Sequence, residues 1–308
     1  MVRLLVGVLE MKKLIRKGKV KEVYQIAPNR LEFHFTDNIS IFDKVVPREV
    51  PRKGESLCKT ASFWFEKVEK LGFKTHYLQM TDDDKMEVEK FDVFDDYKEL
   101  DESFKNYRIP LEFFTRYYVT YSLLKRIADG GIDYNDLGLD GKPELGDKLP
   151  EPFFEVTAKL DGKKEVLDKE EALQLAGLSE EELEEIRKRV LKIDQMIHET
   201  IQGNNLLHAE GSKEFAMNDE GEIVLVDSFG TADEDVFWEA DEYEEGNLVQ
   251  KNEEIVYDYY EETGYLEELE EAKKFEEKEP PIPSLPDELI EKTSEVYIDM
   301  MKRLTNRK

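Results

Sequence analysis

The stretch HAEGSKEFAMNDEGEIVLVDSFGT, residues 208–231, holds two strand-like runs on either side of a polar turn. We place the turn at residues 218–221, a register that sets Glu214 opposite Leu225. Because side chains alternate between the two faces of a strand, Glu214 and Asp227 then lie on one face as diagonal neighbours. The stretch therefore predicts a hairpin that presents two carboxylates side by side.

Two neighbouring carboxylates suit a hard divalent cation. Carboxylate oxygens, phosphate oxygens and water are the ligands that Mg²⁺ takes beside a nucleotide. A register shift of one residue would put Glu214 and Asp227 on opposite faces, so this prediction depends on the turn. The alternative is that the stretch is an ordinary acidic turn in a very acidic protein.

The composition limits the range of partners. The chain of 308 residues carries 72 acidic and 44 basic residues, a formal net charge of -28. Such a field repels nucleic-acid backbones, so we expect no nucleic-acid partner, although a local basic pocket for a phosphorylated small molecule is compatible with it. The single cysteine, Cys58, cannot form an intrachain disulfide, which favours a reducing cytoplasm. The apolar segment at residues 1–11 is too short to span a bilayer and is interpreted as a first strand or a loose start, so we expect no membrane partner.

Secondary-structure signals change along the chain from strands, through a mixed region, to helices. Residues 1–50 hold strand-like runs, and a helix is expected to follow them and to end at Gly72. A longer helix is expected after Ser179, which forms a capping-box pattern with Glu182. This order predicts an α+β fold rather than a doubly wound parallel sheet.

We expect three parts. A small antiparallel N-terminal β lobe with one helix covers residues 1–80, and a larger α+β part that carries the hairpin covers residues 81–246. An acidic helical C-terminal extension covers residues 247–308 and is interrupted by PPIPSLP at 280–286, an extended linker. Its last helix either packs back on the body or forms an oligomer interface, so a homo-oligomer is left open.

The segment RKGKVKEVY, residues 16–24, has a glycine turn flanked by lysines. Gly18 lies between two strand-like runs, with Lys19 and Lys21 on one face. A glycine turn lets a phosphate approach the backbone, and lysines add point charges. The alternative is a solvated strand face, since the segment lacks the spacing of a P-loop.

Two further segments place polar side chains where ligands bind. Between residues 35 and 56, loops between apolar strands hold Ser40, Asp43, Lys53 and Ser56, although Asp and Ser also make ordinary turns. Further on, Arg116 lies in an aromatic strand and Ser122 at the start of a helix, a combination that suits a phosphate. The alternative for this pair is an edge arginine and a helix-capping serine.

The order of these motifs resembles that of the SAICAR synthetase family of the purine pathway. The motifs extend over roughly residues 12–265, and they are, in order, GKVKEVY, FTDNISIFD, PRKGESL with FWFEKVEKLGFKTHY, EFFTRYYVTYSLLKR, FFEVTAKLDGKKEV, the helix at 179–202, GSKEFAMNDEGEIVLVD and DEDVFWEADEYEEG. The resemblance implies an ATP-grasp-like larger part. It also implies a ligase that uses ATP and Mg²⁺ to join L-aspartate to the carboxylate of carboxyaminoimidazole ribonucleotide.

The resemblance also implies residue roles. Gly18, Lys19 and Lys21 would contact the ATP phosphates, while Glu214 and Asp227 would hold Mg²⁺ and, with Lys21, take part in catalysis. The remaining candidates would contact the two small-molecule substrates, and they are Ser40, Asp43, Lys53, Ser56, Arg116, Ser122 and Asp161.

The chain departs from the family pattern at four positions. Ser212 replaces or shifts a lysine of the first hairpin strand, Ser228 replaces a glutamate, Val236 replaces an arginine and Tyr121 replaces a glycine. Lys213 cannot take the place of that lysine, because it points to the opposite face of the strand unless a bulge intervenes. These departures leave two alternative functions open. One is a related amide ligase for another acid or amine, and the other is a non-catalytic nucleotide-binding homologue.

Overall fold

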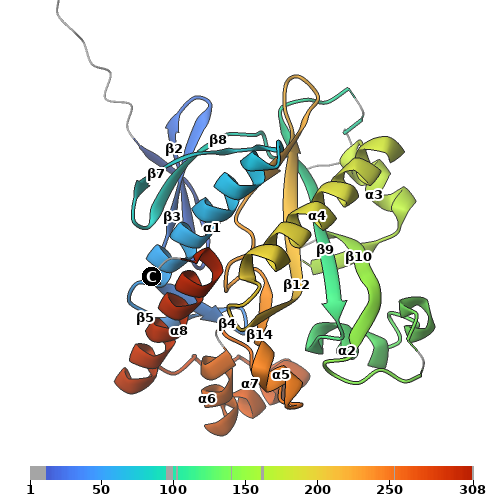
Figure 1. Ribbon diagram of the computed structural model, residues 1–308. Coiled ribbons are helices and arrows are strands. Elements are labelled where there is room, and N and C mark those ends of the chain that lie inside the picture. The colour runs from blue at the N-terminus through green and yellow to red at the C-terminus, as the bar shows by residue number, and fades with distance from the viewer. Residues whose placement is uncertain are drawn as a thin grey trace, which may run out of the picture.

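The computed structural model describes residues 12–94, 100–101, 103–139, 141–160, 163–252 and 254–306. Two main sheets with helices packed on them make up the molecule (Figure 1). This architecture is α+β, so the predicted fold class is confirmed. The segment at residues 1–11, interpreted above as a strand or a loose start, lies outside the described residues.

The N-terminal lobe is a five-stranded antiparallel sheet covered by one helix. Its elements are β1 (Lys13–Lys17), β2 (Lys21–Ala27), β3 (Arg30–Phe35), α1 (Lys53–Lys70), β7 (Tyr77–Asp82) and β8 (Lys85–Glu89), and a separate ribbon pairs β4 (Asn38–Ile41) with β5 (Lys44–Glu49). The sheet order is β1-β2-β3-β8-β7. Alternate residues of β3, Phe33 and Phe35, face α1, where Trp64 and Phe65 are fully buried. The chain enters the larger sheet briefly at residues 74–75 and then returns to this sheet for β7 and β8, which end at Glu89.

The larger lobe is a seven-stranded sheet with helices on its surface. Its strands are β6 (Lys74–Thr75), β9 (Tyr107–Tyr118), β10 (Lys148–Leu160), β11 (Lys163–Leu167), β12 (Leu206–Met217), β13 (Ile223–Val226) and β14 (Val236–Glu239). Its helices are α2 (Tyr121–Ala128), the 3-10 helix Tyr134–Leu137, α3 (Lys169–Ala176) and α4 (Glu180–Ile201). The sheet order is β11-β10-β9-β12-β13-β6, and β14 also pairs with β12. Helix α4 packs on β9 and β12, the two strands that carry most of the candidate site.

Helix α4 begins as the sequence predicts. The hydroxyl of Ser179 accepts a hydrogen bond from the backbone N–H of Glu182, whose carboxylate accepts one from the N–H of Ser179. The capping box is therefore confirmed, and it satisfies two donors that a helix start leaves unpaired. Apolar residues at helical spacing face the sheet, and the fully buried ones are Ile186, Val190, Ile193 and Ile197.

His76 is the residue at which the chain passes from one sheet to the other. The preceding β6 pairs with β13 in the larger lobe, whereas the following β7 pairs with β8 in the N-terminal lobe. The N–H of His76 donates to the carbonyl of Leu225 at 3.0 Å, and its own carbonyl accepts from the N–H of Glu89 at 2.7 Å. The backbone of His76 is therefore hydrogen-bonded to both lobes, to β13 of the hairpin and to the end of β8.

The C-terminal extension packs back on the body. It follows the short helix α5 (Ala240–Glu244) and contains α6 (Glu254–Glu262), α7 (Tyr265–Lys274) and α8 (Asp287–Thr305), and α8 lies beside α1 (Figure 1). Tyr297 and Leu304 of α8 are buried in the hydrophobic core cluster that extends through both lobes. Arg303 anchors the end of α8 through a two-pronged ion pair with Glu239 at 2.6 and 2.8 Å. Within the described ranges, no helix combines the length and the apolar character needed to cross a membrane.

Substitution of Leu304 tests whether α8 is part of the folded core. The side chain is completely buried, so Leu304→Ala should lower the free energy of unfolding by about 2–5 kcal/mol through lost burial and the cavity left behind. Urea unfolding followed by circular dichroism measures this change. The matched control, Phe275→Ala, removes an exposed side chain and should change the value by less than about 0.5 kcal/mol. Equal effects of the two variants would contradict the assignment of α8 to the core.

Candidate active site

A cavity of about 570 Å³ lies between the two lobes. The turn with Gly18 forms one wall, the linker from Glu89 to Val93 forms another, and Glu214 and Asp227 lie in the wall made by the larger lobe. Apolar side chains of both lobes complete the lining, and they are Ile15, Val20, Val23, Leu31, Phe33, Phe91 and Val226. We call this space the inter-lobe cavity. Apolar walls with a few convergent charged groups are typical of a cofactor site.

The hairpin of residues 208–231 forms, but its predicted register is wrong by one residue. Glu214 pairs with Val226, and Met217 pairs with Ile223. The loop has three residues instead of the predicted four, because Asn218 pairs with Glu222, and Gly221 at its end lies in the left-handed region at φ 77°. A three-residue loop with glycine in that conformation is a common hairpin closure.

The carboxylates nevertheless share the cavity, because the backbone turns at Asp227. Strand alternation in the observed register would point Asp227 away from Glu214. However, β13 ends at Val226, and Asp227 adopts a left-handed conformation with φ 61°. Its carboxylate accepts the N–H of Ser228 at 2.7 Å, a local bond that favours this conformation in aspartate. Both carboxylates therefore line the inter-lobe cavity, as predicted, although through a different backbone geometry.

Two cations neutralise the carboxylate pair. The Lys21 ammonium, from the N-terminal lobe, forms an ion pair with Asp227 and lies 3.3 Å from the hydroxyl of Ser228. Arg108, on β9, forms an ion pair with Glu214 and lies 3.8 Å from Asp227. The Lys21–Asp227 pair therefore connects the lobes across the cavity.

The two carboxyl groups have opposite pKa shifts. Burial alone would raise the pKa of Asp227, but Lys21 and Arg108 outweigh it and hold the pKa well below its usual range. Burial raises the pKa of Glu214. The charge of Arg108 lowers this pKa and the charge of Asp227 raises it, and the net result is a raised pKa. Glu214 is therefore the member of the pair that gains most from an additional positive charge.

The donor set fits a hard cation that brings further ligands with it. In the parts of the chain that the structure describes, no group of three or more His, Cys, Asp or Glu side chains is arranged to hold a metal ion. Two carboxylates alone leave most positions of an octahedral Mg²⁺ open for water or phosphate oxygens. The pair is therefore suited to a metal that arrives with a phosphorylated ligand.

His76 places an unsatisfied polar atom beside this cluster. Its side chain is only 3% exposed and packs between Phe33 and Phe65. Burial lowers the pKa of His76 to about 3, so the imidazole is neutral at pH 7. Its Nε2 atom has no hydrogen-bond partner among the described residues, and the residue lines the inter-lobe cavity. Such an orphan atom at a cavity wall favours a ligand that supplies the missing hydrogen bond.

The predicted phosphate turn lies at the opposite wall of the same cavity. Gly18 donates its N–H to the carbonyl of Lys21 at 2.9 Å, and a Cβ on Gly18 would lie 2.7 Å from that carbonyl oxygen. Only glycine fits this turn. Lys19 forms an ion pair with Asp43 at 2.5 Å, and the Asp43 side chain is almost fully exposed.

A second cavity, of about 510 Å³, contains the predicted Ser122 together with Glu210 and Val236. We call it the acidic cavity, because Glu210, Glu254, Asp258 and Glu261 line it and none of its described lining residues is lysine or arginine. Ser122 lies in the first turn of α2, as predicted, and its hydroxyl is 3.2 Å from Glu210.

Arg116 lies at the edge of this acidic cavity and is already neutralised. Its guanidinium forms ion pairs with Glu155 and, at 3.0 Å, with Glu210, and the residue is only 6% exposed. Arg126 adds a second cation on Glu155 at 2.6 Å. The predicted Arg116 and Ser122 are therefore brought together, with Glu210 between them.

Five predicted residues do not line either cavity in the described part of the chain, and they are Ser40, Asp43, Lys53, Ser56 and Arg116. Lys53 is buried at the start of α1, where it forms an ion pair with Asp233 and lies 4.9 Å above the ring of Tyr297. Ser56 is buried within α1 and donates to the carbonyl of Arg52 at 2.8 Å. Ser40 lies on β4, opposite Val45. Their substrate roles stay predictions, and Asp161 lies outside the described residues.

The substituted positions form local pairs instead of substrate contacts. Ser212 donates to Glu112 at 3.1 Å, and Ser228 donates to Glu234 at 3.0 Å. Lys213 points away from the cavities, as predicted, and is buried against Asp194 with Asp235 at 3.6 Å. Asp235 also pairs with His208 at 2.8 Å.

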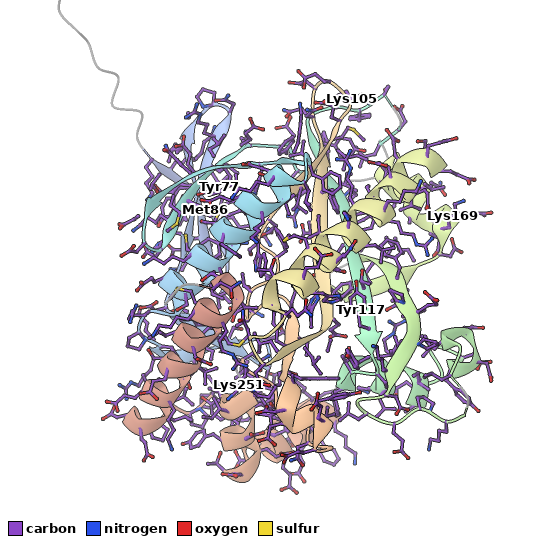
Figure 2. All side chains as sticks on the ribbon, viewed as in Figure 1. Tyr77, Met86, Lys105, Tyr117, Lys169 and Lys251 are labelled. Atoms are coloured by element: carbon purple, nitrogen blue, oxygen red, sulfur yellow. The ribbon has the colours of Figure 1, made fainter. Side chains whose placement is uncertain are left out.

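This buried network belongs to the interior of the larger lobe. Tyr117, which Figure 2 labels, lies on β9 and donates a hydrogen bond to Asp194 at 2.9 Å. A Cβ on Gly211 would lie 2.1 Å from a carboxylate oxygen of Asp235, so the glycine makes room for the network. We interpret Lys213 as the structural cation of this network rather than a ligand-binding residue.

Sequence reasoning missed Arg108 and His76. Arg108 is one of three charged residues that alternate with apolar ones along this strand, with Glu112 and Arg116, and His76 separates two short strand-like runs in FKTHYLQM. Both signals are present in the sequence, but neither indicates proximity to Glu214.

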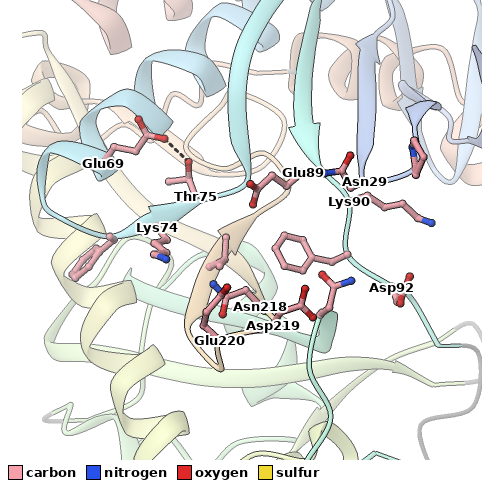
Figure 3. A pocket seen from close by; sticks show the side chains of 15 residues that line it. Asn29, Glu69, Lys74, Thr75, Glu89, Lys90, Asp92, Asn218, Asp219 and Glu220 are labelled. Atoms are coloured by element: carbon pink, nitrogen blue, oxygen red, sulfur yellow. Dashed lines mark hydrogen bonds between the residues drawn. The ribbon is translucent and has the colours of Figure 1, made fainter. Parts of the chain in front are cut away.

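A further cavity of about 570 Å³ lies behind the linker and shares Glu89, Lys90, Phe91 and Asp92 with the inter-lobe cavity. Figure 3 shows its polar lining, including the hydrogen bond of 2.9 Å from Thr75 to Glu69. Its Lys74 forms an ion pair with Glu222. These contacts join β6 to α1 and to the hairpin loop.

The chain has a two-lobed α+β architecture in which a lysine of one lobe faces a carboxylate pair of the other. The model of the family described as SAICAR synthetase matches residues 14–272. The chain belongs to the SAICAR synthetase family.

Individual relatives agree with the family model. A phosphoribosylaminoimidazole-succinocarboxamide synthase of Thermoplasma acidophilum is 45% identical over 296 residues, covering 96% of this chain and 99% of that protein. The protein of the same name from Thermoplasma volcanium is 43% identical, with the same coverage. An identity of 45% over almost the whole of both chains places this chain and the first relative in one family.

Solved structures share the fold. The SAICAR synthase of Saccharomyces cerevisiae complexed with SAICAR superposes with a TM-score of 0.74 at 22% identity, covering 98% of this chain and 96% of that chain. A type-2 SAICAR synthetase in complex with ADP gives a TM-score of 0.66 at 22% identity, covering 95% and 98%. The whole described architecture, rather than one lobe, is therefore that of the family.

Substitution of Lys213 tests the structural role of the buried network. Burial alone would raise the pKa of Asp235, but Lys213 and His208 hold it below its usual value. Lys213→Met leaves buried carboxylates without their cation and should lower the free energy of unfolding at pH 7 by about 3–5 kcal/mol.

The loss should be smaller at pH 5. In the variant Asp235 loses the charge of Lys213 that holds its pKa down, so it takes up a proton more readily in the folded state, which is stabilised as pH falls. Urea unfolding at both pH values measures this, with the exposed Lys169→Met as control, for which a change within about 0.5 kcal/mol is expected. A loss that grows between pH 7 and pH 5 would contradict the assignment.

Proposed function

We propose that this chain uses ATP and Mg²⁺ to join L-aspartate to the carboxylate of carboxyaminoimidazole ribonucleotide, the reaction that forms SAICAR in purine biosynthesis. The observation that carries the proposal is the convergence of Lys21, Glu214 and Asp227 at one end of the inter-lobe cavity. The names of the relatives support the substrates, and the structures solved with SAICAR and with ADP support a product and a nucleotide of this kind.

The reaction sets requirements that the inter-lobe cavity meets. A carboxylate becomes an acyl donor only after its oxygen is phosphorylated, so the charges of phosphates and carboxylate must be screened. Bound Mg²⁺ would supply this screening between phosphate oxygens when held by Glu214 and Asp227. Lys21 lies within ion-pair distance of Asp227 and is placed to transfer its contact to a phosphate. Gly18 and Lys19 close the phosphate end, and the apolar walls fit a nucleobase.

The acidic cavity is the proposed place of the acid and the amine. Arg116 and Ser122 would hold the ribonucleotide, and Glu210, which now contacts both, would exchange these partners for an ordered water or a substrate amine. Holding the amine near the activated carbon is the positioning contribution that the protein must make. We place the reaction in the cytoplasm, in agreement with the single, buried Cys58.

One observation favours a second candidate function, an ATP-dependent amide ligase for a different acid or amine. The described lining of the acidic cavity contains four carboxylates without a lysine or arginine, and Val236 stands where the family pattern has an arginine. Such a lining favours a substrate with a positive charge over an anionic one.

An assay with purified protein separates the candidates. The protein is incubated with ATP, Mg²⁺, carboxyaminoimidazole ribonucleotide and either L-aspartate or a panel of other amines, and ADP and the amide product are quantified. The proposal predicts turnover that requires both L-aspartate and the ribonucleotide. Turnover with another amine but not with aspartate would establish the second candidate, and ADP binding with no turnover of any pair would indicate a non-catalytic protein.

Substitution of the metal carboxylates should remove activity without unfolding the protein. Glu214→Gln or Asp227→Asn should each lower kcat by about 100-fold or more, because each removes an anionic ligand from a two-carboxylate site. The matched control is Asp219→Asn at the exposed tip of the same hairpin, which should retain kcat within about twofold. Circular dichroism checks the fold, and full activity in both carboxylate variants would show that the hairpin is only structural.

A further inference from the structure

Arg108 occupies the space between the two proposed metal ligands. Its guanidinium forms an ion pair with Glu214 and lies 3.8 Å from Asp227, while Lys21 occupies the other oxygen of Asp227. The Arg108 side chain is 29% exposed and lines the inter-lobe cavity, so it is accessible to a ligand there.

The position of Arg108 follows from the pairing of β9 with β12. Arg108 is the Cα partner of Ala216, which lies on the same face of β12 as Glu214, two residues away. On that face of β12, the family pattern has a lysine where this chain has Ser212, whose hydroxyl donates to Glu112. A cation on the neighbouring strand therefore supplies the charge that β12 itself lacks.

Lys21 and Arg108 carry two positive charges, and Glu214 and Asp227 carry two negative charges. The charges of Lys21 and Arg108 offset those of Glu214 and Asp227 without any metal ion. A divalent cation that binds both carboxylates must take at least one of them from Arg108 and would leave the cluster with excess positive charge. The phosphates of a nucleotide remove that excess and give the guanidinium a new anionic partner, for which its fork of donors is suited.

We infer that Arg108 is a positioning residue that couples metal binding to nucleotide binding. It holds Glu214 and Asp227 together before ligands arrive, competes with a metal ion that arrives alone, and turns to the phosphates when metal and nucleotide arrive together. The inference rests on the proposed function, since it takes the inter-lobe cavity to be the nucleotide site.

The test measures Mn²⁺ binding to the nucleotide-free protein by electron paramagnetic resonance, since Mn²⁺ takes the same oxygen ligands as Mg²⁺. Arg108→Met should bind Mn²⁺ about tenfold more tightly than the parent, a coupling of the usual allosteric size. Arg108→Lys keeps the charge but loses the fork of donors, so its Mn²⁺ affinity should lie between that of the parent and that of Arg108→Met. The control for the change in net charge is Arg187→Met, an exposed α4 residue beside Glu184, which should leave Mn²⁺ affinity within about twofold.

The reciprocal measurement uses ATP without metal, in the presence of EDTA, by isothermal titration calorimetry. Arg108→Met should bind metal-free ATP about tenfold more weakly than the parent, because the guanidinium partner of the phosphates is gone. A purely structural ion pair would not move the two affinities in opposite directions. Thermal unfolding verifies that each variant is folded. If Arg108→Met does not fold, both affinities are measured on Arg108→Lys instead.

The outcomes separate this inference from the proposed function. Tighter Mn²⁺ binding together with weaker metal-free ATP binding supports the coupling. Unchanged or weaker Mn²⁺ binding in the Arg108 variants, with normal binding of Mn²⁺ and ATP together by the parent, overturns the coupling and leaves the nucleotide site intact. Failure of the parent to bind ATP with or without metal overturns the proposed function itself.

Discussion

The site depends on the left-handed backbone of Asp227. Strand β13 ends one residue earlier, and the reversal brings a carboxylate that alternation would point away onto the face of Glu214. Aspartate tolerates this conformation because its short side chain bonds the next backbone N–H, here that of Ser228. The local cost, of order 1–3 kcal/mol for a sparsely populated conformation, is offset by the ion pair with Lys21. If residue 227 kept the strand conformation, its carboxylate would point away and Glu214 would lose its carboxylate neighbour.

The same residue joins the two lobes. Lys21 belongs to the sheet of the N-terminal lobe, and Asp227 follows a strand of the larger lobe, so their ion pair crosses the cavity. His76 connects the lobes through its backbone, because its N–H donates to the carbonyl of Leu225. Leu225 lies two residues before Asp227 in the chain. A ligand that exchanges partners with Lys21 therefore acts on a contact between lobes.

Local patterns in the sequence were sufficient to predict the α+β class, the capping box at Ser179 and the two carboxylates of the hairpin. They were insufficient for the register, because a three-residue and a four-residue loop fit the same polar turn. They also missed Arg108, whose proximity to Glu214 depends on pairing between strands about a hundred residues apart. Lys53 shows the same limit, since α8 covers it only after the C-terminal extension folds back.

We propose that Glu214 and Asp227 form one divalent-metal site once a nucleotide enters the inter-lobe cavity. Anomalous diffraction of Mn²⁺ in crystals grown with a non-hydrolysable ATP analogue would locate this metal. We expect one manganese peak with oxygens of both carboxylates and of a phosphate at about 2.0–2.3 Å, and Arg108 withdrawn from Glu214. A peak bound by Asp227 without Glu214, or a metal held elsewhere in the chain, would contradict it.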